Sequence, residues 1–515
     1  MAAASAGAQP VMSSIGEKRR GRVAVTAVAI LALTSRILPY SVPGQILAVR
    51  EYDDGVMLGG AIALLRGLWP YADFVYMHPP GSLLMLTGPA AVAELADEPV
   101  AMALARVVAV LIGVANTVLI GMLLRARGAT AVVTGAGLYA VWPVIVATET
   151  TVLLEPVLLL GLFAALVLVR RSSGLAVVAA GVCLGLATTV KVWAIVDVVL
   201  VALMTWAMLG PRMLFRFAAG ALAAMFAVCL PFFLRAPQAM WEQVVVAQLN
   251  RAGTPASLGA RVGSASLARG TPGIDAVVPW WFWLLFLSAL VALAVIPLGA
   301  DVLARRPARL WSEASWWAVI LLAHLAILLV IRGFFYHYAI WALGPLCLSL
   351  GFWVGGWRGR LWAWVGGACV AAIFLSGAFG AMSRGQSEPP SQRADVIAWA
   401  AQQTCIFAPS STLIAVDAFR RNLDHDCKFD IDAFGAFLVE DPATAAVTDI
   451  AGESSRWTKR QWAHLQAADA AILPDPMTAH WFSNWLSDAQ REKFVSRFAD
   501  EGRFGSDALW ERIDR

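Results

Sequence analysis

The chain has 515 residues, of which 59% are apolar and 14% are charged, and its formal net charge is +4. A water-facing surface cannot cover this much apolar material, and the mean hydropathy of +0.69 agrees, so soluble globular and disordered classes are excluded. We therefore expect an α-helical polytopic membrane protein, with no nucleic-acid partner.

The first apolar run, residues 23–42, follows a short tail, residues 1–22, that ends in the basic stretch from Lys18 to Arg22. The excess of lysine and arginine places this tail in the cytoplasm. The run resembles a signal peptide, but no small-residue cleavage site follows Tyr40. It is therefore interpreted as an uncleaved span.

The later apolar runs are about 17 to 25 residues long, enough to cross a hydrocarbon core of roughly 30 Å as helices. If residues 82–96 were also a span, every later basic cluster would face outwards, which the positive-inside rule disfavours. Residues 55–97 are therefore expected to form interfacial helices outside, and the membrane domain, residues 23–382, is expected to have about eleven spans. The later runs lie near 100–124, 129–147, 152–169, 174–190, 192–210, 217–234, 279–299, 315–332, 339–357 and 361–381.

Two adjacent acids, Asp53 and Asp54, follow the first span. They could be solvated caps of a helix that begins near Gly55, or one of them could be a general base that takes a proton from an acceptor hydroxyl. Adjacent carboxylates also raise each other's proton affinity or recruit a divalent metal ion. Downstream, the Pro79–Pro80 pair gives His78 a defined direction, although a plain turn between interfacial helices explains the prolines equally well.

Further ionisable residues lie at the predicted outer ends of later spans. Glu155 precedes Pro156 in a first helical turn, where helix capping is the alternative to a functional role. Lys191 is either a snorkelling lysine or a cation for a phosphate group. A late turn offers a second phosphate site with aromatic walls. Its candidate substrate-binding residues are Arg332, Tyr336, His337 and Tyr338.

Two weaker candidates lie nearby. Arg36, in the first span, is a third possible cation for phosphate. Of Glu149 and Glu155, only one is expected to face the same cavity as the aspartates, because their spacing puts them on different helix faces.

The outer loop, residues 235–278, has no strong periodicity, so it is either a mobile substrate-binding loop or a plain connector. From residue 383 the composition becomes that of a linker and a charged domain, residues 383–515, expected to be a small α/β cap outside the membrane. If it is outside, Cys405 and Cys427 could form a disulfide. Acids near Cys427 indicate either a metal site or, more simply, a solvated loop. The expected elements are helices near 395–403 and 477–487 and strands near 412–416, 470–473 and 508–513.

These pieces resemble the GT-C superfamily of integral membrane glycosyltransferases, of the type that transfers mannose or aminoarabinose from dolichyl or polyprenyl phosphate. The resemblance covers the spans up to about residue 381. The run Gly67–Pro70 followed by Tyr76–Gly81 looks like the family's tryptophan/proline stretch and its basic residue before Pro-Pro. Many members have lysine at that place, whereas this chain has His78.

Three later segments add to the resemblance. Leu154–Pro156 looks like the family's second outer acid, and Gly185–Lys191 looks like its span ending in lysine. Arg332 with His337 and Tyr338 is similar to a late outer turn that holds the carrier phosphate. The order and common sidedness of the segments carry the resemblance more than any one motif does.

The resemblance implies an inverting transferase, with mannose and arabinose as examples of the sugar, whose donor is a polyprenyl-phosphate sugar and whose acceptor is a glycan, lipid or protein of the cell envelope. Asp53 or Asp54 would be the base, and Lys191, Arg332 and His337 would offset charge on the departing phosphate. The sequence shows no dedicated metal-ligand set, so a divalent cation is optional. The active site and the tail are expected on the extracytoplasmic side of a plasma membrane.

Two other classes stay open. A transporter or flippase of a lipid-linked sugar would also need many spans and outer charges, but such proteins usually show internal repeats, and none is evident here. A non-catalytic scaffold with a partner-binding tail would tolerate asparagine at Asp53 and Asp54.

Overall fold

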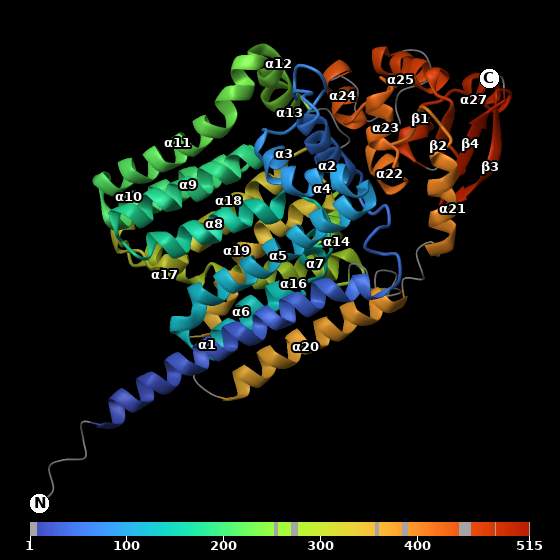
Figure 1. Cartoon of the computed structure of the whole chain (residues 1–515). Coiled ribbons are helices and arrows are strands. Elements are labelled where there is room, and N and C mark those ends of the chain that lie inside the picture. Colours follow the sequence, from blue (N-terminus) through green and yellow to red (C-terminus); the bar gives the residue numbers. More distant parts are fainter. Residues whose placement is uncertain are drawn as a thin grey trace, which may run out of the picture. The chain divides into compact units, whose positions relative to one another are not determined.

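The structure divides the chain into two units, each assembled from stretches that are far apart in the sequence. The computed structural model describes residues 8–251, 256–268, 277–355, 360–383, 390–441, 455–478 and 480–513, and Figure 1 shows their elements in chain order. The first unit comprises residues 1–39, 109–226 and 256–384, and the second comprises residues 40–108, 227–255 and 385–515. The boundary predicted at residue 383 thus lies beside the last junction, but two earlier stretches join the tail. Most of the predicted linker, residues 384–389, lies outside the described residues.

Helices build the first unit, because a span in a membrane must satisfy its backbone hydrogen bonds internally. Among the described residues, five helices are long and apolar enough to cross a membrane, and α16 with α17, bent by 48°, makes a sixth if counted as one span. The remaining apolar helices are shorter, so the count of about eleven spans stays a prediction. The helices with residues in this unit are α1 (Ala8–Ile37), α5 (Glu98–Leu124), α6 (Ala129–Val141), α7 (Pro143–Thr148), α8 (Glu155–Val169), α9 (Gly174–Val190), α10 (Ala194–Leu209), α11 (Pro211–Arg235), α14 (Leu258–Ala265), α16 (Trp280–Ala294), α17 (Ile296–Leu303), α18 (Glu313–Val330), α19 (Ala339–Val354) and α20 (Arg360–Ser383), with short η2 (Arg125–Arg127), η4 (Ala308–Leu310) and η5 (Tyr336–Tyr338).

Local signals in the sequence set the ends of these helices. Pro143 begins α7, where its missing N–H is not needed, so one apolar run forms two helices. Gly210 adopts φ +88° between α10 and α11, a left-handed conformation that glycine tolerates best. Ser173 and Ser312 cap α9 and α18 by accepting hydrogen bonds from the backbone amides of Ala176 and Ser315. The apolar run predicted as one span at 129–147 is thus divided between α6 and α7.

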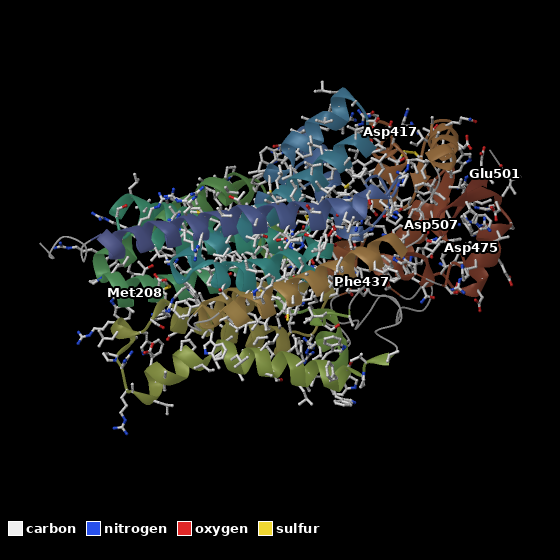
Figure 2. All side chains as sticks on the ribbon, turned by 90° about the horizontal axis from the view of Figure 1, so that it is seen from below. Met208, Asp417, Phe437, Asp475, Glu501 and Asp507 are labelled. Atoms are coloured by element: carbon white, nitrogen blue, oxygen red, sulfur yellow. A yellow bond between two sulfur atoms is a disulfide. The ribbon has the colours of Figure 1, made fainter. Side chains whose placement is uncertain are left out.

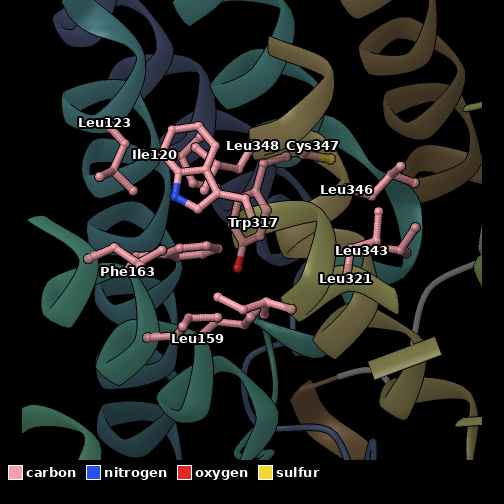
Figure 3. Packing of buried hydrophobic residues seen from close by; sticks show 14 of the residues in the cluster. Ile120, Leu123, Leu159, Phe163, Trp317, Leu321, Leu343, Leu346, Cys347 and Leu348 are labelled. Atoms are coloured by element: carbon pink, nitrogen blue, oxygen red, sulfur yellow. The ribbon is translucent and has the colours of Figure 1, made fainter. Parts of the chain in front are cut away.

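The core of the first unit gathers around Trp317 of α18. Figure 3 shows its indole on the side of Ile120 of α5 and Phe163 of α8, and Leu343 of α19 belongs to the same cluster. These side chains are buried, and Trp317 is 1% exposed. Large apolar side chains thus hold the helices together, and the polar residues described below are inserted into this packing.

The second unit combines short helices with a small sheet. The sheet has the order β1-β2-β4-β3, with β1 and β2 parallel and the other two pairs antiparallel. Acidic residues, among them Asp475, Glu501 and Asp507, lie on or next to these strands (Figure 2). Its elements are η1 (Leu38–Ser41), α2 (Tyr52–Leu65), α3 (Gly81–Met85), α4 (Thr87–Leu95), α12 (Pro237–Trp241), a π-helical turn (Glu242–Val246), α13 (Ala247–Leu249), α21 (Pro390–Ala400), β1 (Ile406–Phe407), α22 (Ser410–Ala415), α23 (Phe419–Asp424), α24 (Ala433–Glu440), α25 (Arg456–Ala467), β2 (Ala470–Pro474), α26 (Trp481–Asn484), α27 (Asp488–Val495), β3 (Phe498–Phe504) and β4 (Asp507–Arg512).

Helix α2 is covered by the tail within the second unit. All of its residues from Asp54 to Ala63 are buried. A Cβ added at Gly55 would lie 2.0 Å from the backbone nitrogen of Ser411, and one at Gly59 would lie 2.8 Å from the ring of Phe419. Helix α2 therefore lies under protein cover.

The structure corrects several expected elements of the tail. The strand predicted at 412–416 is wrong, because Ser410–Ala415 forms α22. All six of its residues are buried, and a short, fully buried helix has the same apolar pattern as a buried strand. The helix predicted at 477–487 is reduced to α26, and β1 and β3 were not expected. The strands near 470–473 and 508–513 are confirmed as β2 and β4.

Two further expectations can be compared with the structure. The outer loop was expected to lack regular structure, but its described part contains α12, α13 and α14, while residues 252–255 and 269–276 lie outside the described residues. Cys405 and Cys427 are joined by a disulfide. This bond ties β1 to the end of α23.

Candidate functional site

The two adjacent acids at the start of α2 have different surroundings. Neither caps the helix, since Glu51 is the N-cap residue and no side chain accepts a capping hydrogen bond there. Asp54 is fully buried, and its Oδ2 accepts hydrogen bonds from Arg106 Nη2 at 2.6 Å and Nε at 3.2 Å. Arg106 also donates to the carbonyl oxygen of Ile46 at 2.6 Å. Asp54 is therefore part of a buried ion pair that fixes the first turn of α2.

Asp53 is half-buried and lies beside an anchored tyrosine. The Tyr52 hydroxyl donates to Oδ1 of Asp432 at 3.2 Å and accepts from the backbone amide of Phe434 at 3.0 Å. Burial, and to a lesser extent the charge of Asp53, raises the pKa of Asp432 to about 7, although the amide of Gly435 donates to its carboxylate. The tail thus holds the residue that precedes Asp53 through α24.

His78 lies in a hydrogen-bonded segment of the same unit. Its carbonyl oxygen accepts a hydrogen bond from the Tyr71 hydroxyl at 2.6 Å, and its ring meets the edge of Tyr76 with centroids 6.0 Å apart. The amide of Tyr76 donates to Gln243 at 2.9 Å. These contacts hold the segment that contains His78, and the role of His78 in binding stays a prediction.

The first unit brings together three of the predicted binding residues. Glu155 is fully buried at the start of α8, and its two carboxylate oxygens face different side chains. Lys191 Nζ donates to Oε1, and His337 Nδ1 lies 2.9 Å from Oε2. Lys191 is 6% exposed, so it does not snorkel to the membrane surface. The start of α8, the end of α9 and η5 thus meet at a buried acid, with Lys191 at one carboxylate oxygen and His337 at the other.

Aromatic rings surround the Lys191 ammonium. Its nitrogen lies 4.3 Å from the ring centroid of Tyr338 and 4.6 Å from that of Trp193. The rings of Tyr336 and His337 lie 5.4 Å apart. Arg332 is exposed and has no ion pair among the residues that the structure describes. The aromatic walls predicted for the late turn therefore lie around Lys191 rather than around Arg332.

Glu149 does not share this surrounding. It is buried in an ion pair with Arg36, whose Nε lies 2.8 Å from Oε2. Its Oε1 accepts hydrogen bonds from Asn116 Nδ2 at 3.1 Å and from the Tyr139 hydroxyl at 2.6 Å. Both carboxylate oxygens are thus bonded to side chains of other helices, namely α1, α5 and α6, so Glu149 holds these helices together.

Sequence reasoning missed several buried polar residues inside the spans. Arg106, Asp197 and His324 each interrupt an apolar run and are at most 1% exposed. His324 Nε2 lies 2.7 Å from Asp197 Oδ1. Ionisable residues inside a predicted span are rare and usually paired, which is the signal that could have identified them.

An apolar cavity of about 400 Å³ lies in the first unit among α14, α16, α18 and α19. Its lining is almost entirely aliphatic, and it includes Phe334. The Phe334 ring meets that of Tyr338 with centroids 6.1 Å apart, and Tyr338 in turn borders Lys191. The cavity therefore begins two aromatic rings away from the Lys191 ammonium. No group of three or more metal-ligating side chains occurs in the part of the chain that the structure describes.

No protein-family model and no curated protein matches this chain. Solved structures do match. The crystal structure of ArnT from Cupriavidus metallidurans bound to undecaprenyl phosphate is 16% identical with a TM-score of 0.52, and the match covers 96% of this chain and 98% of that chain. The crystal structure of the Archaeoglobus fulgidus oligosaccharyltransferase in the apo form is 10% identical with a TM-score of 0.54, and the match covers 96% and 74%.

A third match is partial. The structure of the Saccharomyces cerevisiae protein O-mannosyltransferase Pmt1–Pmt2 complex bound to the sugar donor is 21% identical. The match covers 43% of this chain and 34% of that chain, with a TM-score of 0.34. The two matches along nearly the whole chain, together with its apolar helices, place the protein in a membrane. This chain has the fold of the GT-C superfamily of integral membrane glycosyltransferases.

Proposed function

We propose that this protein transfers a sugar, with inversion, from a polyprenyl-phosphate donor to an acceptor outside the cytoplasm. The observation that carries the proposal is the buried cluster of Glu155, Lys191 and His337, which borders an aliphatic cavity through Tyr338 and Phe334. A polyprenyl phosphate is complementary to this site, because it has an anionic head on a long apolar chain. The ArnT structure holds undecaprenyl phosphate, and an A. fulgidus oligosaccharyltransferase structure holds a dolichol-phosphate.

Lys191 and His337 are the proposed partners of the phosphate. Glu155 offsets part of the Lys191 charge and fixes the direction of both side chains, since each contacts a different oxygen of its carboxylate. Preorganised donors of this kind stabilise the charge that develops on a leaving group. Arg332, which is exposed, and Tyr336 would contribute from the late turn.

Asp53 is the proposed base. The sequence predicted either Asp53 or Asp54 as the base. We choose Asp53 because the buried carboxylate of Asp54 is held by Arg106. In the reaction, Asp53 takes the proton of the acceptor hydroxyl while the hydroxyl oxygen bonds to the anomeric carbon. The bond from that carbon to the phosphate oxygen breaks, and its electron pair leaves with the polyprenyl phosphate. Attack from the opposite face inverts the anomeric centre.

The positions of the basic clusters in the sequence support a site at the outer face of a plasma membrane. The acceptor would be a glycan, lipid or protein of the cell envelope, and mannose and arabinose are the first donor sugars to test. A divalent cation stays optional in this proposal.

The proposal is tested by transfer of radiolabelled sugar from undecaprenyl-phosphate mannose, arabinose or aminoarabinose in membranes that carry the full chain at matched expression. Asp53→Asn should lower transfer by about 100-fold or more, as expected for the loss of a general base. Asp488→Asn, which removes an exposed acid of the tail, should transfer like the wild type. Equal transfer by Asp53→Asn and the wild type would contradict the assignment of the base. Passage of the donor across the membrane without transfer would instead indicate a flippase.

A further inference from the structure

A buried acid–histidine pair in the first unit has no role in the chemistry proposed above. Asp197 of α10 and His324 of α18 are both fully buried. His324 Nε2 lies 2.7 Å from Asp197 Oδ1, and His324 Nδ1 lies 2.9 Å from the carbonyl oxygen of Trp341. The second carboxylate oxygen of Asp197 accepts the indole N–H of Trp341 at 3.1 Å.

The hydrogen-bond acceptors around Asp197 and His324 determine how many protons the pair carries. The Trp341 carbonyl can only accept, so Nδ1 of His324 carries a proton. The bond between Nε2 and Oδ1 then needs one further proton, held by either residue. In both cases the pair is neutral as a whole and every polar atom named here has a partner. Removal of one member would leave the other buried without compensation.

Both members of the pair bind Trp341. Its indole N–H and its carbonyl oxygen are each held by one member, and its ring stacks on His324 with centroids 3.9 Å apart and an interplanar angle of 20°. Trp341 also packs against Trp193, with centroids 5.4 Å apart. The position of Trp193 therefore depends on a tryptophan that is fixed at three points.

Trp193 and Tyr338 are the two rings that flank the Lys191 ammonium, and they meet each other with centroids 4.5 Å apart. A continuous series of contacts thus leads from Asp197 and His324 through Trp341 and Trp193 to Lys191. A lysine side chain has four rotatable bonds, so rigid walls are needed if its charge is to meet a phosphate at one place.

We propose that Asp197 and His324 are positioning residues that hold Lys191 in the orientation in which it binds the carrier phosphate. The inference rests on the proposed function, because it assigns these residues to the same phosphate. The competing explanation is that the pair only fastens α10, α18 and α19 together. That explanation predicts an effect on stability and none on phosphate binding once stability is restored.

The experiment measures the apparent Kd of undecaprenyl phosphate for the purified full-length protein in nanodiscs, alongside its unfolding temperature. Asp197→Asn should weaken binding roughly tenfold or more, in line with the effect of misplacing a binding group by about 1 Å. Glu149→Gln is the matched control, since it also breaks a buried ion pair of the first unit but leaves the walls of Lys191 intact. Lys191→Met should abolish binding.

The double variant Asp197→Leu/His324→Leu separates positioning from fastening, because apolar replacement of both members of a buried pair often preserves stability. Because it leaves the indole N–H and the carbonyl of Trp341 without these partners, it should unfold between Asp197→Asn and the wild type, and it should still bind the lipid weakly. Wild-type binding by this variant, or equal losses in Asp197→Asn and Glu149→Gln, would overturn the inference alone. If the wild-type protein did not bind undecaprenyl phosphate, the proposed function would fail and the inference with it.

Discussion

Arg106 and Asp54 form a buried ion pair, with 2.6 Å between Nη2 and Oδ2. Asp53, which precedes Asp54 in the sequence, is half-buried. Consecutive side chains in a helix diverge by about 100°, so one acid can be sealed in the protein while its neighbour is not. The pair explains why two adjacent carboxylates need not share a role.

Asp54→Asn should therefore reduce stability rather than chemistry. It leaves the Arg106 guanidinium buried without a counter-charge, at a cost of about 3–5 kcal/mol. The free energy of unfolding of the purified protein measures this cost. Asp54→Leu combined with Arg106→Leu should recover most of it, and a double variant as unstable as the single one would contradict this account.

Asp432 should make the second unit more stable in acid than near neutrality. Its pKa is raised to about 7, so between about pH 4 and 7 the unfolded chain loses a proton that the folded chain retains. Stability then falls as pH rises through this window, by at most roughly 4 kcal/mol. Asp432→Asn should stabilise the protein at pH 8 and have little effect at pH 4, as followed by thermal unfolding. The same difference at both pH values would argue against a buried, protonated acid.

Gly55→Ala should separate α2 from α22. The new Cβ would lie 2.0 Å from the backbone nitrogen of Ser411, and overpacking of this kind costs about 1–3 kcal/mol. Gly88→Ala is the control in α4, because no atom lies within 4 Å of its added Cβ. The control should be neutral or slightly stabilising, by up to about 1 kcal/mol. Equal unfolding temperatures of the two variants would contradict the close approach.

Loss of the disulfide should destabilise the tail. Cys405 and Cys427 are 22 residues apart, and closing a loop of this size contributes about 3 kcal/mol through the unfolded chain. Cys405→Ser/Cys427→Ser should therefore unfold at a lower temperature than the wild type, and reducing agent should lower only the wild-type value. An unchanged wild-type transition under reduction would show that the bond does not contribute.

The sequence predicted the order of the apolar helices because a membrane span is specified locally, by length and hydropathy. It also predicted that Lys191 and Glu155 matter, because each interrupts such a run. Their contact with each other and with His337 was not predictable, since it depends on how distant helices pack.

The misses have physical causes of the same kind. The strand expected at 412–416 became α22 because a completely buried segment loses the periodicity that separates helix from strand. Arg106 and Asp197 were overlooked because hydropathy averages over a span and hides a single charged residue. Each of them could be found by asking which partner would neutralise it.

The covering of α2 by the tail has a consequence for biosynthesis. Residues 52–65 leave the ribosome long before Ser411 and Phe419, which close over Gly55 and Gly59. Until then α2 of the nascent chain exposes its apolar surface, and chaperones and proteases recognise such surfaces. Helix α2, which carries Asp53 and Asp54, therefore reaches its final packing late in synthesis. A chain that ends before residue 410 would keep α2 exposed to cellular proteases.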